Sequence, residues 1–177
     1  MSVFSELCSY MYWTDIGTKT IMRAYMNGSS PESVLRSSLQ NPIALAADQE
    51  SVSESVFYVD SMNYKVGVPA GTLTSVGTPL GIDVRREYTY WAEYNKDGYS
   101  TINRVPRSST TAQTFYSRIT GQVRNLKVVT WGGQPQNREN HCEGHSCSHI
   151  CVLNAESFEC LCPDGMHLGA DGKTCAA

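Results

Sequence analysis

Six of the seven cysteines of the chain gather between Cys142 and Cys175, and they are the residues with the clearest chemistry. Their spacing is C-x4-C-x3-C-x8-C-x-C-x12-C, formed by Cys142, Cys147, Cys151, Cys160, Cys162 and Cys175. A segment this short buries too little apolar surface to be stable by itself, so disulfides that restrict the unfolded chain are expected. Spacing alone leaves the connectivity open. The pattern predicts a small disulfide-rich module made in an oxidising compartment.

Zinc binding is the competing chemistry for the same residues. His145, Cys147, His149 and Cys151 alternate along the chain, and Cys and His side chains are common zinc ligands. Side chains that alternate along one strand point to one face, which suits a tetrahedral site poorly unless the backbone turns sharply. We therefore expect disulfides, with no bound metal and no cofactor, and with the histidines in exposed loops.

Composition and charge argue against several classes of protein. The 177 residues allow one or two domains, and a hydrophobic content of 41% is enough for a globular core. The net charge is −3, and basic residues do not gather in runs with interleaved aromatics, so a nucleic-acid partner is not expected. The sequence has no apolar run that approaches the ~20 residues of a membrane-spanning helix. The first eight residues lack the basic and apolar regions of a signal peptide, so a secreted module is expected to be a piece of a longer protein.

A four-residue motif recurs three times in residues 1–135. The copies are Tyr12-Trp13-Thr14-Asp15, Phe57-Tyr58-Val59-Asp60 and Tyr90-Trp91-Ala92-Glu93, at intervals of 45 and 33 residues. Short β-branched and aromatic runs lie between Gly, Asn and Asp turn signals, as in four-stranded antiparallel units. A β-sandwich with chance aromatic pairs explains three copies in the same context poorly. The repeats predict an all-β partial propeller of about three blades.

Three further segments fit this repeat. Residues 42–48 and 79–83 both begin with proline, end with aspartate and precede a later copy of the motif, and residues 123–129 form a degenerate third copy. In the first unit, residues 20–26 are predicted as a strand and residues 34–35 lie on the returning strand. The dipeptide Asn27-Gly28 between them is predicted to supply two residues with positive φ in a tight hairpin.

The repeats resemble the YWTD, or class B, repeats of the low-density lipoprotein receptor family, whose blades close into a propeller. The proline-led segments are similar to the innermost strand of its blades. The pair Cys160-Leu-Cys162, followed by Pro-Asp-Gly, resembles the last half of an epidermal-growth-factor-like (EGF-like) module, which commonly follows the last blade in that family. The likeness covers nearly all of the chain. It implies a partial propeller at 1–135, a linker at 136–141 and an EGF-like module at 142–177.

The resemblance also implies roles for single residues. The disulfides would be Cys142–Cys151, Cys147–Cys160 and Cys162–Cys175. The motif aromatics would pack within and between blades. The motif acids would anchor backbone and neighbouring-blade groups, and Asp15 and Asp60 fit this role. Glu93 departs from it, so the third blade is expected to hold its neighbour less rigidly. Acids that repeat once per blade are better explained as structure than as the paired carboxylates of a glycosidase, so no enzyme activity is expected.

Three blades are too few to close a ring, because propellers use roughly four to eight. We expect the remaining blades to be supplied by a longer parent protein or by a partner chain. Cys8, the seventh cysteine, is then a buried strand residue or the partner of a cysteine elsewhere, and burial is favoured.

The expected function is non-catalytic protein binding outside the cell, within the ectodomain of a membrane receptor. An endocytic lipoprotein-receptor-related protein and a Wnt co-receptor both fit, so lipoprotein, Wnt-pathway and matrix proteins are candidate ligands. A nidogen-like matrix component is the alternative, and a growth-factor-like ligand is a weaker one. Propeller recognition uses loop residues, and Arg85, Arg86, Tyr94 and Lys96 look exposed, but the ligand-binding residues stay unknown.

Three further expectations concern calcium binding, the response to pH and glycosylation. Residues 138–141 and Leu153 do not match the calcium-binding pattern of EGF-like modules, so a calcium-free module with a structural role is expected. All four histidines lie between His141 and His167, so binding to the blades should change little between about pH 7.4 and about pH 5.5. The sequence Asn27-Gly28-Ser29 is a glycosylation sequon as well as a turn.

Overall fold

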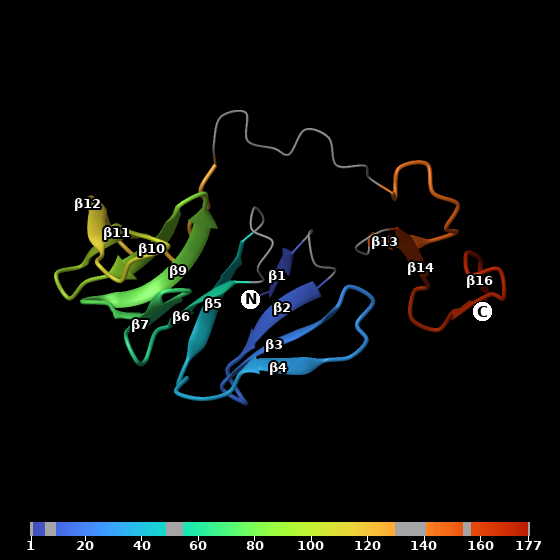
Figure 1. The fold of residues 1–177 in the computed structure, drawn as a ribbon, viewed down its shortest axis with the longest axis horizontal. Helices are drawn as coiled ribbons and strands as arrows, with labels where there is room; N and C mark the ends of the chain where they lie inside the picture. Colours follow the sequence, from blue (N-terminus) through green and yellow to red (C-terminus); the bar gives the residue numbers. More distant parts are fainter. Residues whose placement is uncertain (1, 6–9, 49–54, 130–140, 154–156, 177) are drawn as a thin grey trace.

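The structure is a computed structural model that describes residues 2–5, 10–48, 55–129, 141–153 and 157–176. The described residues form antiparallel strands joined by turns. Three four-stranded sheets stand side by side, and a small module with short strands lies beyond the first sheet (Figure 1). Cys8 lies outside the described residues. So do residues 130–140, which include residues 136–140 of the expected linker.

Each of the three sheets is a blade whose strands follow one another in chain order. Blade 1 contains β1 (Ser2–Ser5), β2 (Tyr10–Asp15), β3 (Thr20–Tyr25) and β4 (Glu32–Leu35). Blade 2 contains β5 (Pro42–Ala47), β6 (Val56–Asp60), β7 (Lys65–Val68) and β8 (Gly71–Thr74). Blade 3 contains β9 (Thr78–Arg85), β10 (Tyr88–Tyr94), β11 (Tyr99–Pro106) and β12 (Gln113–Thr120). The motif therefore occupies the second strand of each blade, and the repeat reflects one structural unit.

The apolar core lies between neighbouring blades. Between blades 2 and 3, Phe57 and Trp91 are buried in one cluster with small and β-branched side chains of both sheets. Between blades 1 and 2, Tyr12 and Leu45 are buried in a second cluster. Burying a large apolar side chain contributes about 1.5–3 kcal/mol, so these contacts stabilise each blade chiefly through its neighbour.

The first strand of each later blade lies innermost among the described contacts. Strand β5 packs against β9 and also against β1 and β2 of the preceding blade. Its alternate residues Ala44 and Ala46 are buried, and such small side chains let two strands approach closely. Strand β12, at the other end of blade 3, is exposed along nearly its whole length.

The hairpin between β3 and β4 differs from the expectation. Gly28 has a φ of 81°, whereas Asn27 does not have positive φ, so the expected pair of positive-φ residues is wrong. The N–H of Gly28 donates to the carbonyl of Tyr25 at 2.8 Å, and the N–H of Tyr25 donates to the carbonyl of Ser29 at 3.0 Å. This is the three-residue alternative, a type I turn followed by glycine in the left-handed region.

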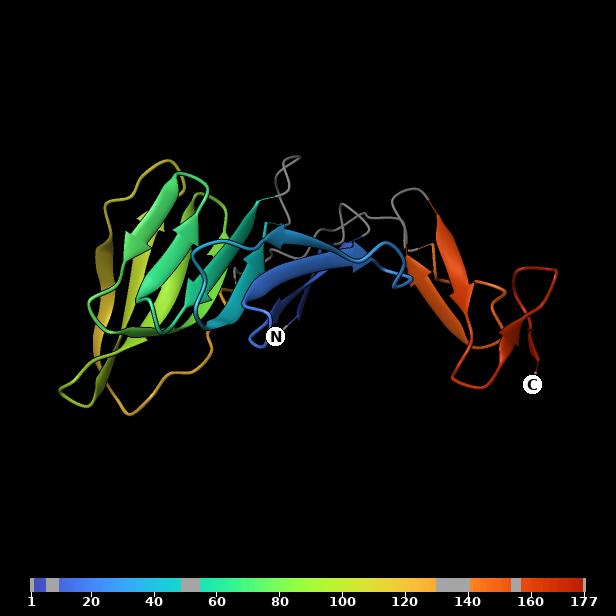
Figure 2. The same ribbon diagram turned by 90° about the horizontal axis from the view of Figure 1, so that it is seen from below.

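The C-terminal module consists of two short hairpins. The first pairs β13 (Ile150–Leu153) with β14 (Phe158–Leu161), and the second pairs β15 (His167–Leu168) with β16 (Cys175–Ala176). Ser148 connects the two, because its N–H donates to the carbonyl of Lys173 and its Oγ accepts the N–H of Cys175, both at 2.9 Å. Both views place this module beside the β3–β4 hairpin (Figures 1 and 2).

Candidate ligand-binding surface and disulfide module

Asp60, the motif acid of blade 2, is fully buried and holds the chain that enters its own blade. Its carboxylate accepts the backbone N–H groups of Gln40 at 2.7 Å and Asn41 at 2.8 Å. It also accepts the side-chain amide of Asn63 at 2.9 Å. Because both oxygens already accept donors in a buried position, this acid anchors the link between blades 1 and 2.

Asp15, the motif acid of blade 1, is partly exposed at the end of β2. Its Oδ1 accepts the N–H of Thr18 at 3.0 Å. This hydrogen bond, together with one from the Thr18 side chain, lowers the pKa of Asp15 below its usual value of 3.8. Within the described residues, the carboxylate therefore stabilises the β2–β3 turn.

Glu93, the motif acid of blade 3, is buried and accepts the hydroxyl of Ser75. Ser75 belongs to the segment that connects β8 with β9, so Glu93 contacts the link that enters its own blade, as Asp60 does. Its partner is a side-chain hydroxyl instead of a pair of backbone N–H groups. Whether this blade holds its neighbour less rigidly stays a prediction.

The motif aromatics divide between buried and half-buried positions. Tyr12, Phe57 and Trp91 are each at most 2% exposed and belong to the two core clusters. Half-buried positions are taken by Trp13, Tyr58 and Tyr90. Tyr90 meets the exposed Phe115 edge-on, with ring centroids 5.6 Å apart, so the motif also supports the outermost strand of blade 3.

A small cavity of about 50 Å³ opens where β5 and β9 end, and it combines acidic and basic side chains. Asp83 lies on it and accepts the N–H of Val128 at 2.6 Å, while Lys127 Nζ lies 3.2 Å from its other oxygen. Arg85 and Arg86 also lie on its wall. Asp48 also lines the cavity, and it forms an ion pair with Arg107, which is not a lining residue. The lining contains three basic side chains and two acidic ones, so its net charge is positive.

The degenerate third copy at residues 123–129 runs along β9, although it forms no strand. A Cβ on Gly81 would lie 2.9 Å from the Cα of Asn125, so glycine permits this close approach. The expected third copy of the innermost strand is therefore not formed here, and the contact of this segment with Asp83 was not predicted. The two proline-led segments are also offset in register: Asp48 follows β5, whereas Asp83 pairs with Tyr90 inside blade 3.

The four exposed-looking residues of blade 3 do not form one patch. Arg85 and Arg86 lie at the β9–β10 turn, beside the cavity, whereas Tyr94 and Lys96 lie at the opposite end of β10. Arg86 and Lys96 are exposed, and Arg85 and Tyr94 are half-buried. A ligand that contacts one pair would therefore meet one end of the blade.

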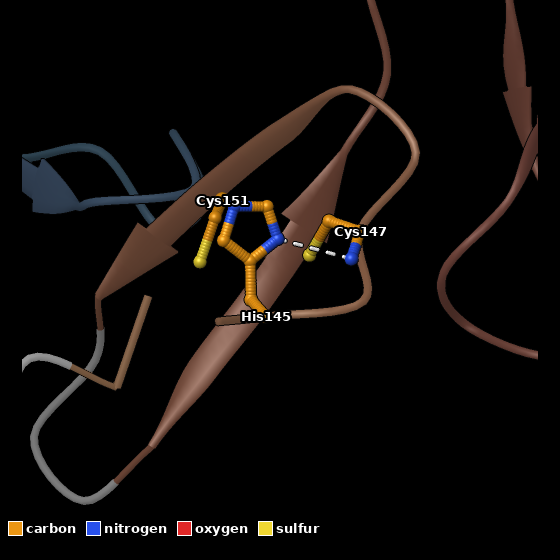
Figure 3. Close-up of side chains that lie close together, drawn as sticks. All are labelled: His145, Cys147 and Cys151. Atoms are coloured by element: carbon orange, nitrogen blue, oxygen red, sulfur yellow. Dashed lines mark hydrogen bonds between the residues drawn. The ribbon is translucent and has the colours of Figure 1, made fainter. Parts of the chain in front are cut away.

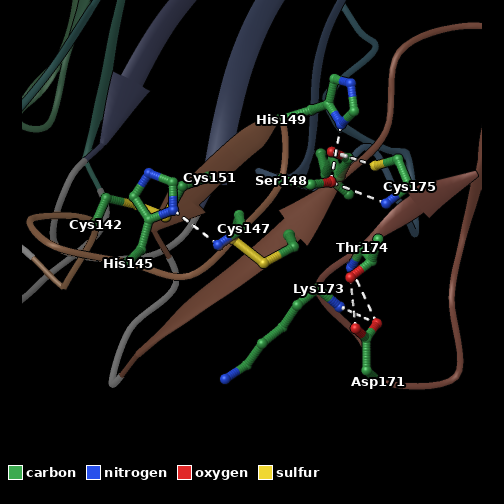
Figure 4. The surroundings of a disulfide bond; sticks show 12 residues. Cys142, His145, Cys147, Ser148, His149, Cys151, Asp171, Lys173, Thr174 and Cys175 are labelled. Carbon is green, nitrogen blue, oxygen red and sulfur yellow. Dashed lines mark hydrogen bonds between the residues drawn. A yellow bond between two sulfur atoms is a disulfide. The ribbon is translucent and has the colours of Figure 1, made fainter.

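Three disulfides cross-link the C-terminal module. They join Cys142 to Cys151, Cys147 to Cys160 and Cys162 to Cys175, with Cα–Cα separations of 5.9, 5.4 and 5.6 Å. Figure 4 shows the first two beside the loop that carries Ser148. This is the pairing that the EGF-like resemblance implies.

His145, Cys147 and Cys151 bring one ligand atom each to within 4.8 Å of the others, as a metal site would require (Figure 3). The backbone turns here instead of continuing as a strand, so the argument from side chains that alternate along a strand does not apply. Both sulfur atoms belong to disulfides, however, and zinc binds the thiolate. The Nδ1 atom of His145 accepts the N–H of Cys147 at 3.0 Å, so this histidine stabilises the loop.

Asp171 organises the turn before the last cysteine. Its carboxylate accepts the hydroxyl of Thr174 at 2.6 Å and the N–H groups of Thr174 and Lys173 at 3.0 and 2.9 Å (Figure 4). These bonds, led by that from the Thr174 side chain, lower the pKa of Asp171 from 3.8 to about 2. The turn positions Cys175 for its disulfide and for pairing in β16.

Comparison with known protein families agrees with both parts of the chain. Residues 9–48 match the low-density lipoprotein receptor repeat class B. Residues 138–175 match a family described as the coagulation factor Xa inhibitory site. The Vitellogenin receptor Yl of Drosophila melanogaster is 25% identical over 93% of this chain and 9% of its own length. Low-density lipoprotein receptor-related protein 4 is 30% identical in Rattus norvegicus and 29% in Homo sapiens, in both over 62% of this chain and 6% of the relative.

The chain is similar to proteins of the low-density lipoprotein receptor family. It spans less than a tenth of the length of these curated relatives. A solved nidogen/laminin complex has the same fold over 71% of this chain and 50% of its own, with a TM-score of 0.61 and 22% identity. The class B repeats are thus blades of a partial propeller, followed by a disulfide-rich EGF-like module. Within the described ranges, no helix is long and apolar enough to span a membrane.

Proposed function

We propose that the chain is a non-catalytic, extracellular protein-binding part of a receptor of the low-density lipoprotein receptor family. This proposal rests on the environment of Asp60, whose carboxylate is buried and accepts two backbone N–H groups. An acid that repeats once per blade and is hydrogen-bonded in this way has a structural role, so ligand binding is expected in the loops between the strands. Receptor names among the relatives support the same class.

We propose the cavity end of blades 2 and 3 as the ligand-binding surface. Its lining carries three cationic side chains, Arg85, Arg86 and Lys127, against the two acids Asp48 and Asp83. Surplus positive charge at a rigid rim favours a ligand with an acidic surface. Ligands of lipoprotein, Wnt-pathway or matrix type all remain candidates, and the name of the fruit-fly relative makes vitellogenin the first protein to try.

The domain boundaries are part of the proposal. Residues 1–135 would form the propeller part, 136–141 the linker and 142–177 the EGF-like module, which would act as a spacer. Blades from the longer parent protein or a partner chain would complete the ring. Three disulfides support an oxidising, extracellular setting for this arrangement.

A direct binding measurement tests the proposal. The full chain, oxidised to three disulfides, is immobilised and exposed to purified vitellogenin, with purified laminin in a parallel channel and serum albumin as the control protein. We expect saturable binding of vitellogenin. Saturable binding of laminin alone would favour the nidogen-like matrix alternative, whose support is a likeness of fold. Equal signals for all three proteins would contradict specific binding.

A further inference from the structure

Asn27 connects the first blade with the EGF-like module. It lies exposed in the β3–β4 turn, and its Nδ2 atom donates to Oε2 of Glu159 in β14 at 3.0 Å. The two residues are 132 positions apart in the chain. The turn and the module lie side by side in both ribbon views (Figures 1 and 2).

The oxygen of the Asn27 side-chain amide is held by Ser29, the third residue of the same sequon. The Oδ1 atom of Asn27 accepts the N–H of Ser29 at 2.9 Å and the hydroxyl of Ser29 at 2.7 Å. An N–H group can only donate and an ionised carboxylate can only accept, so these partners fix which amide atom is oxygen and which is nitrogen. The nitrogen that contacts Glu159 is the atom that N-glycosylation modifies.

We propose that Asn27 is an N-glycosylation site whose occupancy decides whether the EGF-like module rests against the first blade. In the reaction, Nδ2 forms a bond to the anomeric carbon of a lipid-pyrophosphate-linked oligosaccharide. The bond between that carbon and the pyrophosphate breaks, one amide proton leaves, and the lipid pyrophosphate departs. The inference rests on the extracellular setting of the proposed function.

Glycan attachment competes with the contact to Glu159, because it replaces one of the two hydrogens on Nδ2 by a sugar. The first sugar is joined by a single bond to an atom that now lies 3.0 Å from the carboxylate. A sugar ring is far wider than this gap and competes with Glu159 for the space beside Nδ2, so we infer that the module moves away from the hairpin when the glycan is attached. The unglycosylated chain keeps the contact.

Two measurements on the full chain, directed into the secretory pathway of animal cells, test the inference. Intact mass before and after peptide N-glycosidase digestion should show one glycan, which Ser29→Ala removes and Ser29→Thr restores. Carbodiimide labelling should then modify Glu159 several-fold faster in the glycosylated chain than in Ser29→Ala. Labelling of the exposed Glu143 should be equal in both and serves as the internal reference.

Two results would overturn the inference. A secreted chain with three disulfides but no glycan at Asn27 would refute the modification. Equal labelling of Glu159 in both chains would refute an effect of the glycan on the module. Ligand binding enters neither readout, so these failures are distinct from failure of the proposed function.

Discussion

Arg107 and Asp48 join blade 3 to blade 2 through an ion pair, with 2.5 Å between Nη2 and Oδ2. Asp48 follows the innermost strand β5, and Arg107 follows β11. The Asp48 side chain is 3% exposed and that of Arg107 is 25% exposed. The guanidinium also lies over the ring of Phe57, 5.5 Å from its centroid. One arginine thus connects the charged end of blade 2 with the apolar core between the blades.

The first prediction concerns this ion pair. Asp48→Asn should lower the free energy of unfolding by about 2–3 kcal/mol, because it leaves a largely buried guanidinium without its counter-ion. Thermal unfolding of Asp48→Asn, Arg107→Met and the double variant should give a coupling energy of about 1–3 kcal/mol. Strictly additive effects would show that the pair does not connect the blades energetically.

The second prediction concerns the motif acid of blade 2. Asp60→Asn replaces an acceptor by an NH2 donor opposite the N–H groups of Gln40 and Asn41, and should lower the free energy of unfolding by about 2–3 kcal/mol. The melting temperature should fall by roughly 5–10 °C. The exposed Glu87→Gln is the matched control and should change stability by at most about 0.5 kcal/mol. Equal melting temperatures for Asp60→Asn and wild type would refute an anchoring role.

The third prediction concerns acid titration of the module. Hydrogen bonds lower the folded-state pKa of Asp171 to about 2, from 3.8, so its carboxylate stabilises the turn above about pH 4. This contribution is lost as the pH falls from about 4 towards about 2. Thr174→Val removes the hydroxyl donor and keeps the backbone N–H, so the pKa should rise towards 3.8 in a carbon-13 titration of the carboxyl group. An unchanged pKa would assign the shift to the backbone donors alone.

Much of this architecture could be predicted from the sequence, because the motif repeats one structural unit. The three copies lie on the second strand of each blade, but the buried aromatic is the first motif residue in Tyr12 and Phe57 and the second in Trp91. The Asn27-Gly28 turn was predicted in the right place with the wrong geometry, since a dipeptide does not distinguish a two-residue loop from a three-residue loop.

The long-range polar contacts could not be predicted. Arg107 lies far from Asp48 in the sequence, and no spacing rule links them. The bond between Glu93 and Ser75 depends on how the connecting segment enters blade 3, which is a property of the folded chain. Similarly, separation of Arg86 from Lys96 becomes evident only once the direction of β10 is known.

The fourth prediction concerns the response to acidic pH. The blades contain no histidine, since all four lie between His141 and His167. Binding of vitellogenin to the chain should therefore change little between about pH 7.4 and about pH 5.5, where histidine is the side chain that ordinarily changes charge. A variant with all four histidines changed to glutamine should behave as wild type. A steep loss of affinity at the lower pH that this variant abolishes would place the ligand on the module.

The most direct test of the proposed binding surface compares two charge reversals at opposite ends of β10. Arg86→Glu and Lys96→Glu both replace an exposed cation by an anion, but only Arg86 lies beside the cavity. Binding of purified vitellogenin to each immobilised chain should weaken about tenfold in Arg86→Glu, equivalent to about 1.4 kcal/mol, and stay unchanged in Lys96→Glu. A loss confined to Lys96→Glu, or the same loss in both variants, would contradict binding at the cavity end of the blades.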